Sequence, residues 1–141
     1  MSLPKISIVI PSYNYGKYIE KAIKSVIDQN YPNYELLVLD GGSQDETVDI
    51  IKKYESKIAF WRSHKDSGSY VSANEGIEKA TGDIIGILCA DDWYELGTFN
   101  DVGQAFANDR ELDIVSFYAR YHSEDKTLAD RIETKKMELD F

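Results

Sequence analysis

The chain has 141 residues and a formal net charge of −9 at pH 7. Its composition, 43% hydrophobic and 29% charged, is typical of one folded domain and excludes global disorder. The excess of carboxylates disfavours a nucleic-acid binder, because a phosphate backbone would be repelled, and it suits divalent cations. Cys89 is the single cysteine, which excludes an intrachain disulfide and a cysteine-rich zinc cluster.

The chain contains no apolar run of transmembrane length, and its start lacks the pattern of a signal peptide. Its longest apolar stretch, residues 84–90, has the length of a strand. Together with the single cysteine, these features predict a cytoplasmic protein.

The first part of the chain predicts a strand, a helix and a second strand. Residues 6–10 form a short β-branched run, which is typical of a buried strand. Apolar side chains then recur with the spacing of one helix face, at Ile19, Ala22, Ile23, Val26 and Ile27. Residues 35–39 predict the second strand, and residues 43–46 have the pattern of a helix capping box.

The same alternation continues to residue 118. The second helix is expected to bury Val48, Ile51 and Tyr54, the third Tyr70, Ala73, Ile77 and Ala80, and the fourth Phe99, Val102 and Phe106. Strands are expected at residues 58–61, 83–88 and 114–118.

This order of strands and helices predicts an α/β fold with a Rossmann-like, mostly parallel sheet flanked by helices. We expect one domain over residues 1–122. From residue 123 to residue 141, charges of both signs mix with isolated apolar residues. We interpret this charged C-terminal segment as the start of a truncated acceptor-side region.

Four polar clusters follow the expected strands, at residues 11–14, 40–43, 64–68 and 91–92. Any one of them also fits a helix cap or a solvated loop. Because the carboxyl ends of parallel strands meet at one edge of a sheet, where such folds bind ligands, the four together favour a binding site.

Asp91 and Asp92 are adjacent carboxylates, which repel each other unless solvent or a cation lies between them. Mg²⁺ and Mn²⁺ take oxygen ligands, commonly one or two carboxylates together with substrate phosphates. From these two residues alone, a metal site and a helix-capping pair remain equally open.

Asp40 is an acceptor at the end of a strand that could take an N–H from a nucleobase, and Gly41 and Gly42 would let a flat ring approach. The glycines also fit a tight turn followed by a cap from Ser43. Neither G-x-G-x-x-G nor a P-loop motif is present, which disfavours nucleotide dehydrogenases and P-loop NTPases. We interpret Cys89 as an inert core thiol.

The motifs at residues 6–14, 39–47, 80–88 and 90–92, in this order, resemble family 2 glycosyltransferases of the GT-A fold. The resemblance covers residues 5 to about 120 and implies a GT-A type sheet. It also implies a nucleotide-sugar donor, commonly UDP-linked, and a divalent metal, Mg²⁺ or Mn²⁺.

The resemblance implies roles for individual residues of the nucleotide pocket. By position, Pro11, Tyr13 and Asn14 would line the pocket, with the Tyr13 ring as a stacking face. Asp40 would accept a hydrogen bond from the base.

The same resemblance implies that Asp66 and Gly68 border the donor, as in bacterial members. Asp91 would face the ribose or the sugar, and Asp92, with Asp91 beside it, would bind the metal that bridges the diphosphate. Cys89 stands where the family often has Asp or Asn.

The implied function is sugar transfer, with inversion, to a saccharide or lipid-linked acceptor in cell-surface polysaccharide synthesis. Inverting members place the general base after the metal motif. The residues after Asp92 hold no clear counterpart, so we place the base outside this chain. We expect the full-length protein at the inner face of the cell membrane.

Two other interpretations stay open. The chain could be a non-catalytic nucleotide- or metal-binding α/β module of the same fold. It could also be a different Mg²⁺-dependent phosphotransfer or receiver-type domain. A receiver would carry its acidic pair after the first strand, where this chain has residues 11–14.

Overall fold

The computed structural model describes residues 3–117 and 119. The chain divides into two compact units, Met1–Arg110 and Glu111–Phe141. The first unit contains a parallel sheet of four strands in the order β3-β2-β1-β4. The strands are β1 (Ile6–Ser12), β2 (Tyr34–Asp40), β3 (Phe60–Ser63) and β4 (Ile84–Ile87).

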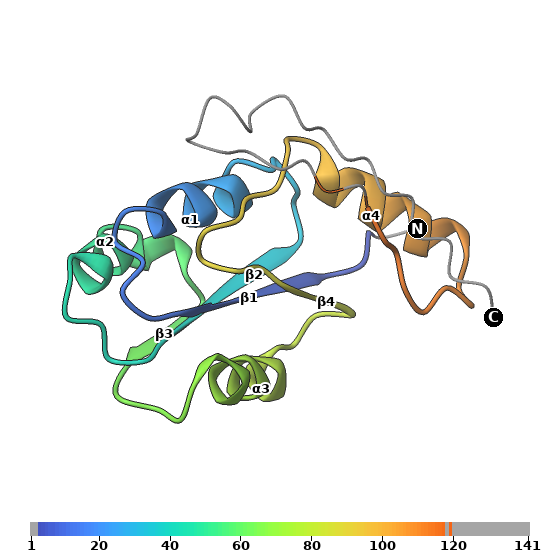
Figure 1. The fold of residues 1–141 in the computed structure, drawn as a ribbon. Helices are drawn as coiled ribbons and strands as arrows, with labels where there is room; N and C mark the ends of the chain where they lie inside the picture. The colour runs from blue at the N-terminus through green and yellow to red at the C-terminus, as the bar shows by residue number, and fades with distance from the viewer. Residues whose placement is uncertain (1–2, 118, 120–141) are drawn as a thin grey trace, which may run out of the picture. The chain divides into compact units, whose positions relative to one another are not determined.

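Helices cover both faces of this sheet. They are α1 (Ile19–Ile27), α2 (Thr47–Lys53), α3 (Ser69–Lys79) and α4 (Thr98–Asn108), with a short 3-10 turn at Glu55–Lys57. Figure 1 shows α1 and α2 on one side of the sheet and α3 on the other. This arrangement confirms the predicted α/β fold with a parallel sheet. Among the described residues, no helix is long and apolar enough to span a bilayer.

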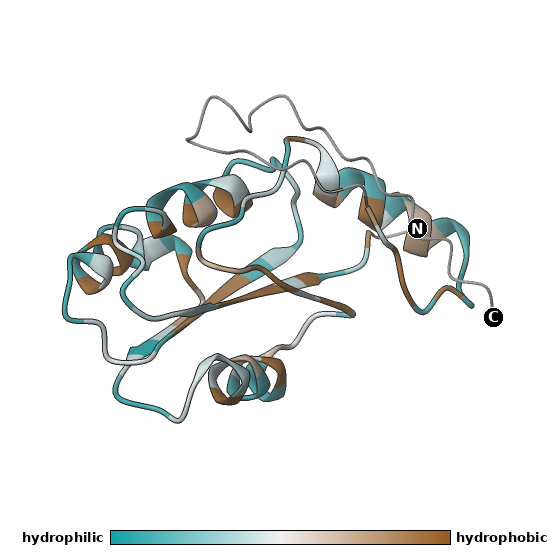
Figure 2. Cartoon of the chain, viewed as in Figure 1, coloured by the Kyte–Doolittle hydropathy of each residue, from teal (hydrophilic) through white to brown (hydrophobic). Residues whose placement is uncertain are grey.

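The larger core lies on the α1 side of the sheet. Alternate residues of β1, Ile6, Ile8 and Ile10, point into it, as the period of two in a strand requires. The predicted face of α1 packs against them, and Phe99 of α4 joins the same cluster. Figure 2 shows this pattern as hydrophobic colour along the strands and along the inward side of α1.

The buried face of α3 differs from the predicted one. Tyr70 is 87% exposed, whereas Ser72, Ala73 and Gly76 are buried. A Cβ atom at Gly76 would lie only 2.2 Å from Cγ1 of Val9. Burial of Ala73 is as predicted, but Tyr70 and Ile77 are exposed, because α3 approaches β1 too closely for anything but small side chains.

Two local predictions also need correction. The capping box at residues 43–46 does not form, because α2 begins at Thr47, whose N–H donates to Oδ1 of Asp45 at 3.1 Å. The third strand lies two residues later than predicted, while Ile58 packs in the core.

The expected fifth strand at residues 114–118 does not form: residues 112–117 have no regular secondary structure, and residue 118 lies outside the described residues. A β-branched run becomes a strand only when it pairs with a neighbour. The expected domain boundary at residue 122 also lies outside the described residues.

A partly buried ion pair joins the amino-terminal ends of the strands. Glu35 accepts hydrogen bonds from Lys5 Nζ at 2.7 Å, from Ser7 Oγ at 2.6 Å and from the Thr81 N–H at 2.6 Å. Burial acts to raise the pKa of Glu35, but these hydrogen bonds together lower it to about 2. The carboxylate therefore links β2 to the start of β1 and to the segment that leads into β4.

We expect Glu35→Gln to lower the free energy of unfolding at pH 7 on the order of 2–3 kcal/mol. The reason is that the folded chain holds the pKa of this carboxyl at about 2, below its ordinary value of 4.5. The wild-type chain should lose this contribution as the pH falls from 4.5 towards 2. Urea unfolding at several pH values measures both effects.

The matched control is Glu78→Gln, which removes an exposed carboxylate from α3. It should unfold like the wild type. Equal stability of Glu35→Gln and Glu78→Gln at pH 7 would contradict the structural role of Glu35.

Candidate functional site

The loop after β1 is tied to the loop after β2 at the carboxyl edge of the sheet. Asn14, with a left-handed backbone (φ 56°), accepts the Gln44 N–H on Oδ1 at 2.9 Å. Its own N–H donates to Ser43 Oγ at 2.7 Å. The Gly16 N–H donates to Asp45 Oδ2 at 2.9 Å. These bonds bring two of the four predicted clusters into one unit, with Asn14 as a structural link.

Asp40 has no exposed surface. Its Oδ2 accepts the N–H groups of Gly42 and Ser43, at 3.0 and 2.8 Å, and the hydroxyl of Ser63 at 2.6 Å. Its Oδ1 accepts the hydroxyl of Ser43 at 2.5 Å. The expectation placed this carboxylate against a base. In the structure its oxygens accept donors of the loop and of Ser63, and its contact with a base stays a prediction.

Tyr13, Gly41 and Asp66 meet beside this loop. A Cβ atom at Gly41 would lie 3.3 Å from Oδ1 of Asp66 and 3.5 Å from the Tyr13 ring. The Tyr13 ring is 56% exposed, so one face is available for stacking. Pro11 lies within β1, paired with Leu39 of the neighbouring strand. The loops after β1, β2 and β3 thus form one wall.

Arg62, at the end of β3, was missed by the sequence analysis. Its Nη1 donates to the Asp40 carbonyl at 2.6 Å and to Oδ2 of Asp66 at 3.1 Å. Its Nε and Nη2 both donate to Glu75 of α3, at 3.0 and 2.7 Å, and Nη2 also reaches Ser72 Oγ. A charged residue inside an apolar strand was the available signal.

Asp66 is held from three directions. Its Oδ1 accepts the Gly68 N–H at 2.9 Å, and its Oδ2 accepts from Arg62 and from the Ser72 hydroxyl. Burial acts to raise the pKa of Asp66, but these hydrogen bonds and the Arg62 charge lower it below its usual value. Gly68, the residue directly before α3, has a φ of 123°. The carboxylate is therefore ionised and fixed in orientation.

Asp91, Asp92 and Cys89 form the fourth cluster, after β4. One ligand atom from each residue lies within 4.8 Å of the other two, and all three residues are exposed. The prediction that Cys89 is a core thiol was wrong, because Cys89 is exposed while its neighbours Leu88 and Ala90 are the buried residues there. The strand before the pair is also half-exposed, with Ile85 and Ile87 open to solvent.

The segment that carries the acidic pair is anchored on α1. The Tyr94 N–H donates to Ser25 Oγ at 3.1 Å. The buried Gln29 side chain donates to the Glu95 carbonyl at 2.9 Å and accepts the Phe99 N–H at 3.2 Å. These bonds hold the chain that follows the two carboxylates against α1 and the residues after it.

The electrostatics of this cluster favour a cation. Loss of solvent around the carboxyl and, next, the charge of Asp91 raise the pKa of Asp92. The Asp91 charge is also the first cause of a raised pKa at Tyr15, whose hydroxyl therefore stays protonated. A bound cation would relieve the repulsion between the two carboxylates.

The donor set fits a hard cation through its oxygens. Two neighbouring carboxylates with open surface beside them suit Mg²⁺ or Mn²⁺, which keep further positions for water or phosphate. The Cys89 thiol is a softer ligand and does not suit Mg²⁺. We therefore assign any hard-cation binding here to the carboxylates alone.

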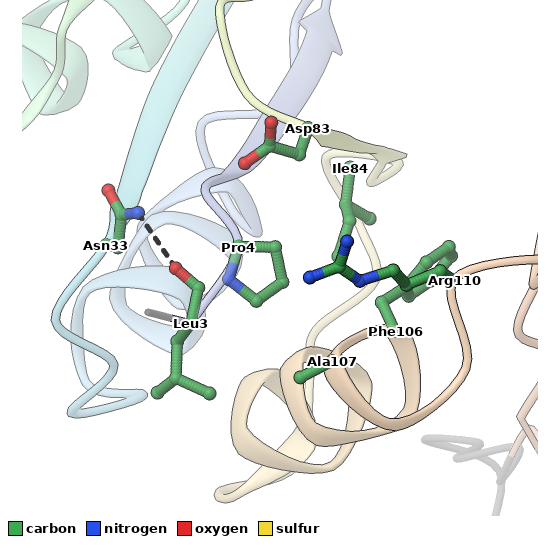
Figure 3. Close-up of a pocket in the computed structure, with 8 residues that line it drawn as sticks. All are labelled: Leu3, Pro4, Asn33, Asp83, Ile84, Phe106, Ala107 and Arg110. Atoms are coloured by element: carbon green, nitrogen blue, oxygen red, sulfur yellow. Dashed lines mark hydrogen bonds between the residues drawn. The ribbon is translucent and has the colours of Figure 1, made fainter. Parts of the chain in front are cut away.

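A separate cavity of about 480 Å³ lies at the amino-terminal edge of the sheet. Figure 3 shows Asn33 and Asp83 on one side of it and Arg110 with Phe106 on the other. None of the predicted site residues lines this cavity. In a parallel sheet it lies at the opposite edge from the clusters, so we do not assign it to the same site.

Comparison with known proteins gives the same family for most of the chain. A family profile described as Glycosyl transferase family 2 matches residues 7–138. The putative teichuronic acid biosynthesis glycosyltransferase TuaG of Bacillus subtilis is 37% identical over 92 residues, 63% of this chain and 36% of that protein. Glycosyltransferase AglE of Haloferax volcanii is 36% identical over 106 residues, 68% of this chain and 35% of that protein. The chain spans about a third of the length of these curated relatives.

A solved structure matches in fold as well. S. aureus TarS 1–349 in complex with UDP-GlcNAc superposes with a TM-score of 0.68 at 27% identity. The match covers 74% of this chain and 31% of that one. The sheet is accordingly of the GT-A type, as the resemblance implied. The chain belongs to glycosyl transferase family 2.

Proposed function

We propose that this chain is the donor-binding part of a glycosyltransferase that uses a nucleotide diphosphate sugar, with UDP as the nucleotide. The observation that carries this proposal is the convergence at one sheet edge of the Tyr13–Gly41–Asp66 wall and the Asp91–Asp92 pair. The wall offers the Tyr13 ring for stacking and the Asp66 carboxylate as a fixed acceptor. The Asp91–Asp92 pair offers a cation site. TarS, similar in fold and sequence, was solved with UDP-GlcNAc, which supports a UDP-sugar.

The metal in this proposal is Mg²⁺ or Mn²⁺, held by Asp92 with Asp91 beside it. When bound, such a cation neutralises the negative charge that develops on a leaving diphosphate. The chain's own residues bind and orient the donor: Tyr13 stacks on the base, and Asp91 faces the ribose or the sugar. Gly68 borders the donor beside Asp66.

The acceptor and the chemistry of transfer extend the proposal beyond this chain. An acceptor hydroxyl on a saccharide or lipid-linked sugar attacks the anomeric carbon with inversion, and a base outside the chain takes its proton. The name of TuaG, a putative teichuronic acid biosynthesis glycosyltransferase, supports a role in cell-surface polysaccharide assembly, which we place at the inner face of the membrane.

We expect UDP to bind the chain more tightly in the presence of Mn²⁺ by about tenfold or more, which corresponds to about 1.4 kcal/mol per factor of ten. Asp92→Asn should abolish this difference, because it removes one charged ligand while keeping the shape of the side chain. Isothermal titration calorimetry with UDP, with and without Mn²⁺, measures both effects. The control Asp101→Asn changes an exposed carboxylate on α4 and should behave as the wild type. Equal UDP affinity of the wild type with and without Mn²⁺ would refute the metal site.

We also expect Asp92→Asn to unfold at a slightly higher temperature than the wild type when no metal is present at pH 7. The folded chain raises the pKa of Asp92, so ionised Asp92 destabilises the fold and neutral Asn does not. The difference should shrink as the pH falls towards 4, because the folded chain then protonates this carboxyl. Thermal unfolding followed by circular dichroism measures it. A lower unfolding temperature for Asp92→Asn at pH 7 would indicate a structural capping role instead.

A further inference from the structure

We propose that Ser25 and Gln29, at the carboxyl end of α1, are positioning residues of the cation site after β4. They fix the chain that follows Asp92 and so hold the two neighbouring carboxylates in one arrangement for a divalent cation. The inference rests on the metal site of the proposed function, and it extends that site to two residues that carry no ligand atom. The sequence analysis singled out neither of them.

Gln29 is a polar residue in the core of the first unit. It is only 2% exposed, and a buried amide is costly unless its polar atoms find partners. Its Nε2 donates to the carbonyls of Ser25 and Glu95, each at 2.9 Å, and its Oε1 accepts the Phe99 N–H at 3.2 Å. Because the nitrogen and the oxygen are both engaged, the side chain is held in one orientation.

The bonds of Gln29 join the ends of two helices. The last carbonyls of a helix and its first N–H groups have no partner inside that helix. The Ser25 carbonyl lies in the last turn of α1, and the Phe99 N–H lies in the first turn of α4, whose N-cap, Gly97, has no side chain to offer. Gln29 serves both groups, and its bond to Glu95 ties down the segment between the acidic pair and α4.

Ser25 fixes the same segment closer to the carboxylates. Its hydroxyl donates to the Ala22 carbonyl at 2.7 Å and accepts the Tyr94 N–H at 3.1 Å. Tyr94 follows Asp92 by two residues, and its ring packs against Phe99 with the ring centroids 5.4 Å apart. The chain just after the acidic pair is therefore bound to α1 through a side chain that α1 itself orients.

The sheet fixes the chain before the acidic pair. The Leu88 N–H donates to the Val9 carbonyl of β1 at 2.9 Å, and within the turn the Asp92 N–H donates to the Cys89 carbonyl at 3.0 Å. The two carboxylates thus lie on a short span whose ends, at Leu88 and Tyr94, are both bonded to the fold. Since like charges repel, these anchors keep together two carboxylates that would otherwise move apart. A cation can then bind without first ordering the turn.

The test measures the factor by which Mn²⁺ tightens UDP binding, by calorimetry on the 141-residue chain with and without the ion. The wild type should show a factor of about ten or more. Gln29→Met keeps the length of the side chain without its hydrogen bonds and should reduce the factor to about two. Ser25→Ala should give an intermediate factor, and Ser25→Thr, which retains the hydroxyl, should give the wild-type factor. UDP affinity without Mn²⁺ should stay unchanged in every variant, because neither residue belongs to the wall beside Tyr13.

Glu35→Gln is the matched control, because it weakens the fold at the amino-terminal edge and leaves the acidic turn intact. It should unfold at a lower temperature than the wild type and keep the full Mn²⁺ factor. A Gln29→Met chain that is destabilised in the same way but keeps the wild-type factor overturns the positioning role alone. If the wild type shows no Mn²⁺ effect, the proposed metal site fails and this inference fails with it. If Gln29→Met does not fold, Ser25→Ala decides: an unchanged factor refutes the proposal, and a loss that Ser25→Thr restores supports it.

Discussion

The candidate site depends on one buried carboxylate. Asp40 sits at the last position of β2, where leaving it without partners would cost far more than the loop could offset. The chain satisfies it with donors from its own turn and from Ser63 of β3. Its backbone carbonyl accepts a hydrogen bond from the Arg62 guanidinium. Because these partners come from two strands and the loop between them, satisfying this charge also sets the shape of the wall beside Tyr13.

The close packing of α3 extends that constraint to the far side of the wall. Gly76 lets the helix lie directly on Val9, and this contact brings the first turns of α3 up to the end of β3. Ser72 and Glu75 can then bind Arg62, which in turn holds Asp66. The contacts of Arg62 and the packing on the sheet therefore use the same helix, and a change at its small buried face would alter both.

Carboxylates have opposite effects on stability at the two edges of the sheet. At the amino-terminal edge, Glu35 and Lys5 pair, and the carboxylate contributes to stability. At the carboxyl edge, Asp91 and Asp92 repel each other, and the pKa of Asp92 rises. Paired charges thus support the fold at one edge, and at the other edge neighbouring carboxylates remain exposed and repel each other. Because its pKa is raised, ionised Asp92 destabilises the folded chain at this edge of the sheet.

The sequence by itself determined the alternation of strands and helices, and from it the parallel sheet and the edge that carries the polar clusters. Periodicity reports burial along one dimension, and the buried runs of β1 and β2 with the helical stripe of α1 suffice for that inference. Only the tertiary structure decided which charges are buried. It enclosed Asp40, exposed Cys89 and brought the strand residue Arg62 into contact with Asp66. The reason is physical: the partners of Arg62 lie on β2 and α3, and their meeting depends on how closely the helix approaches the sheet.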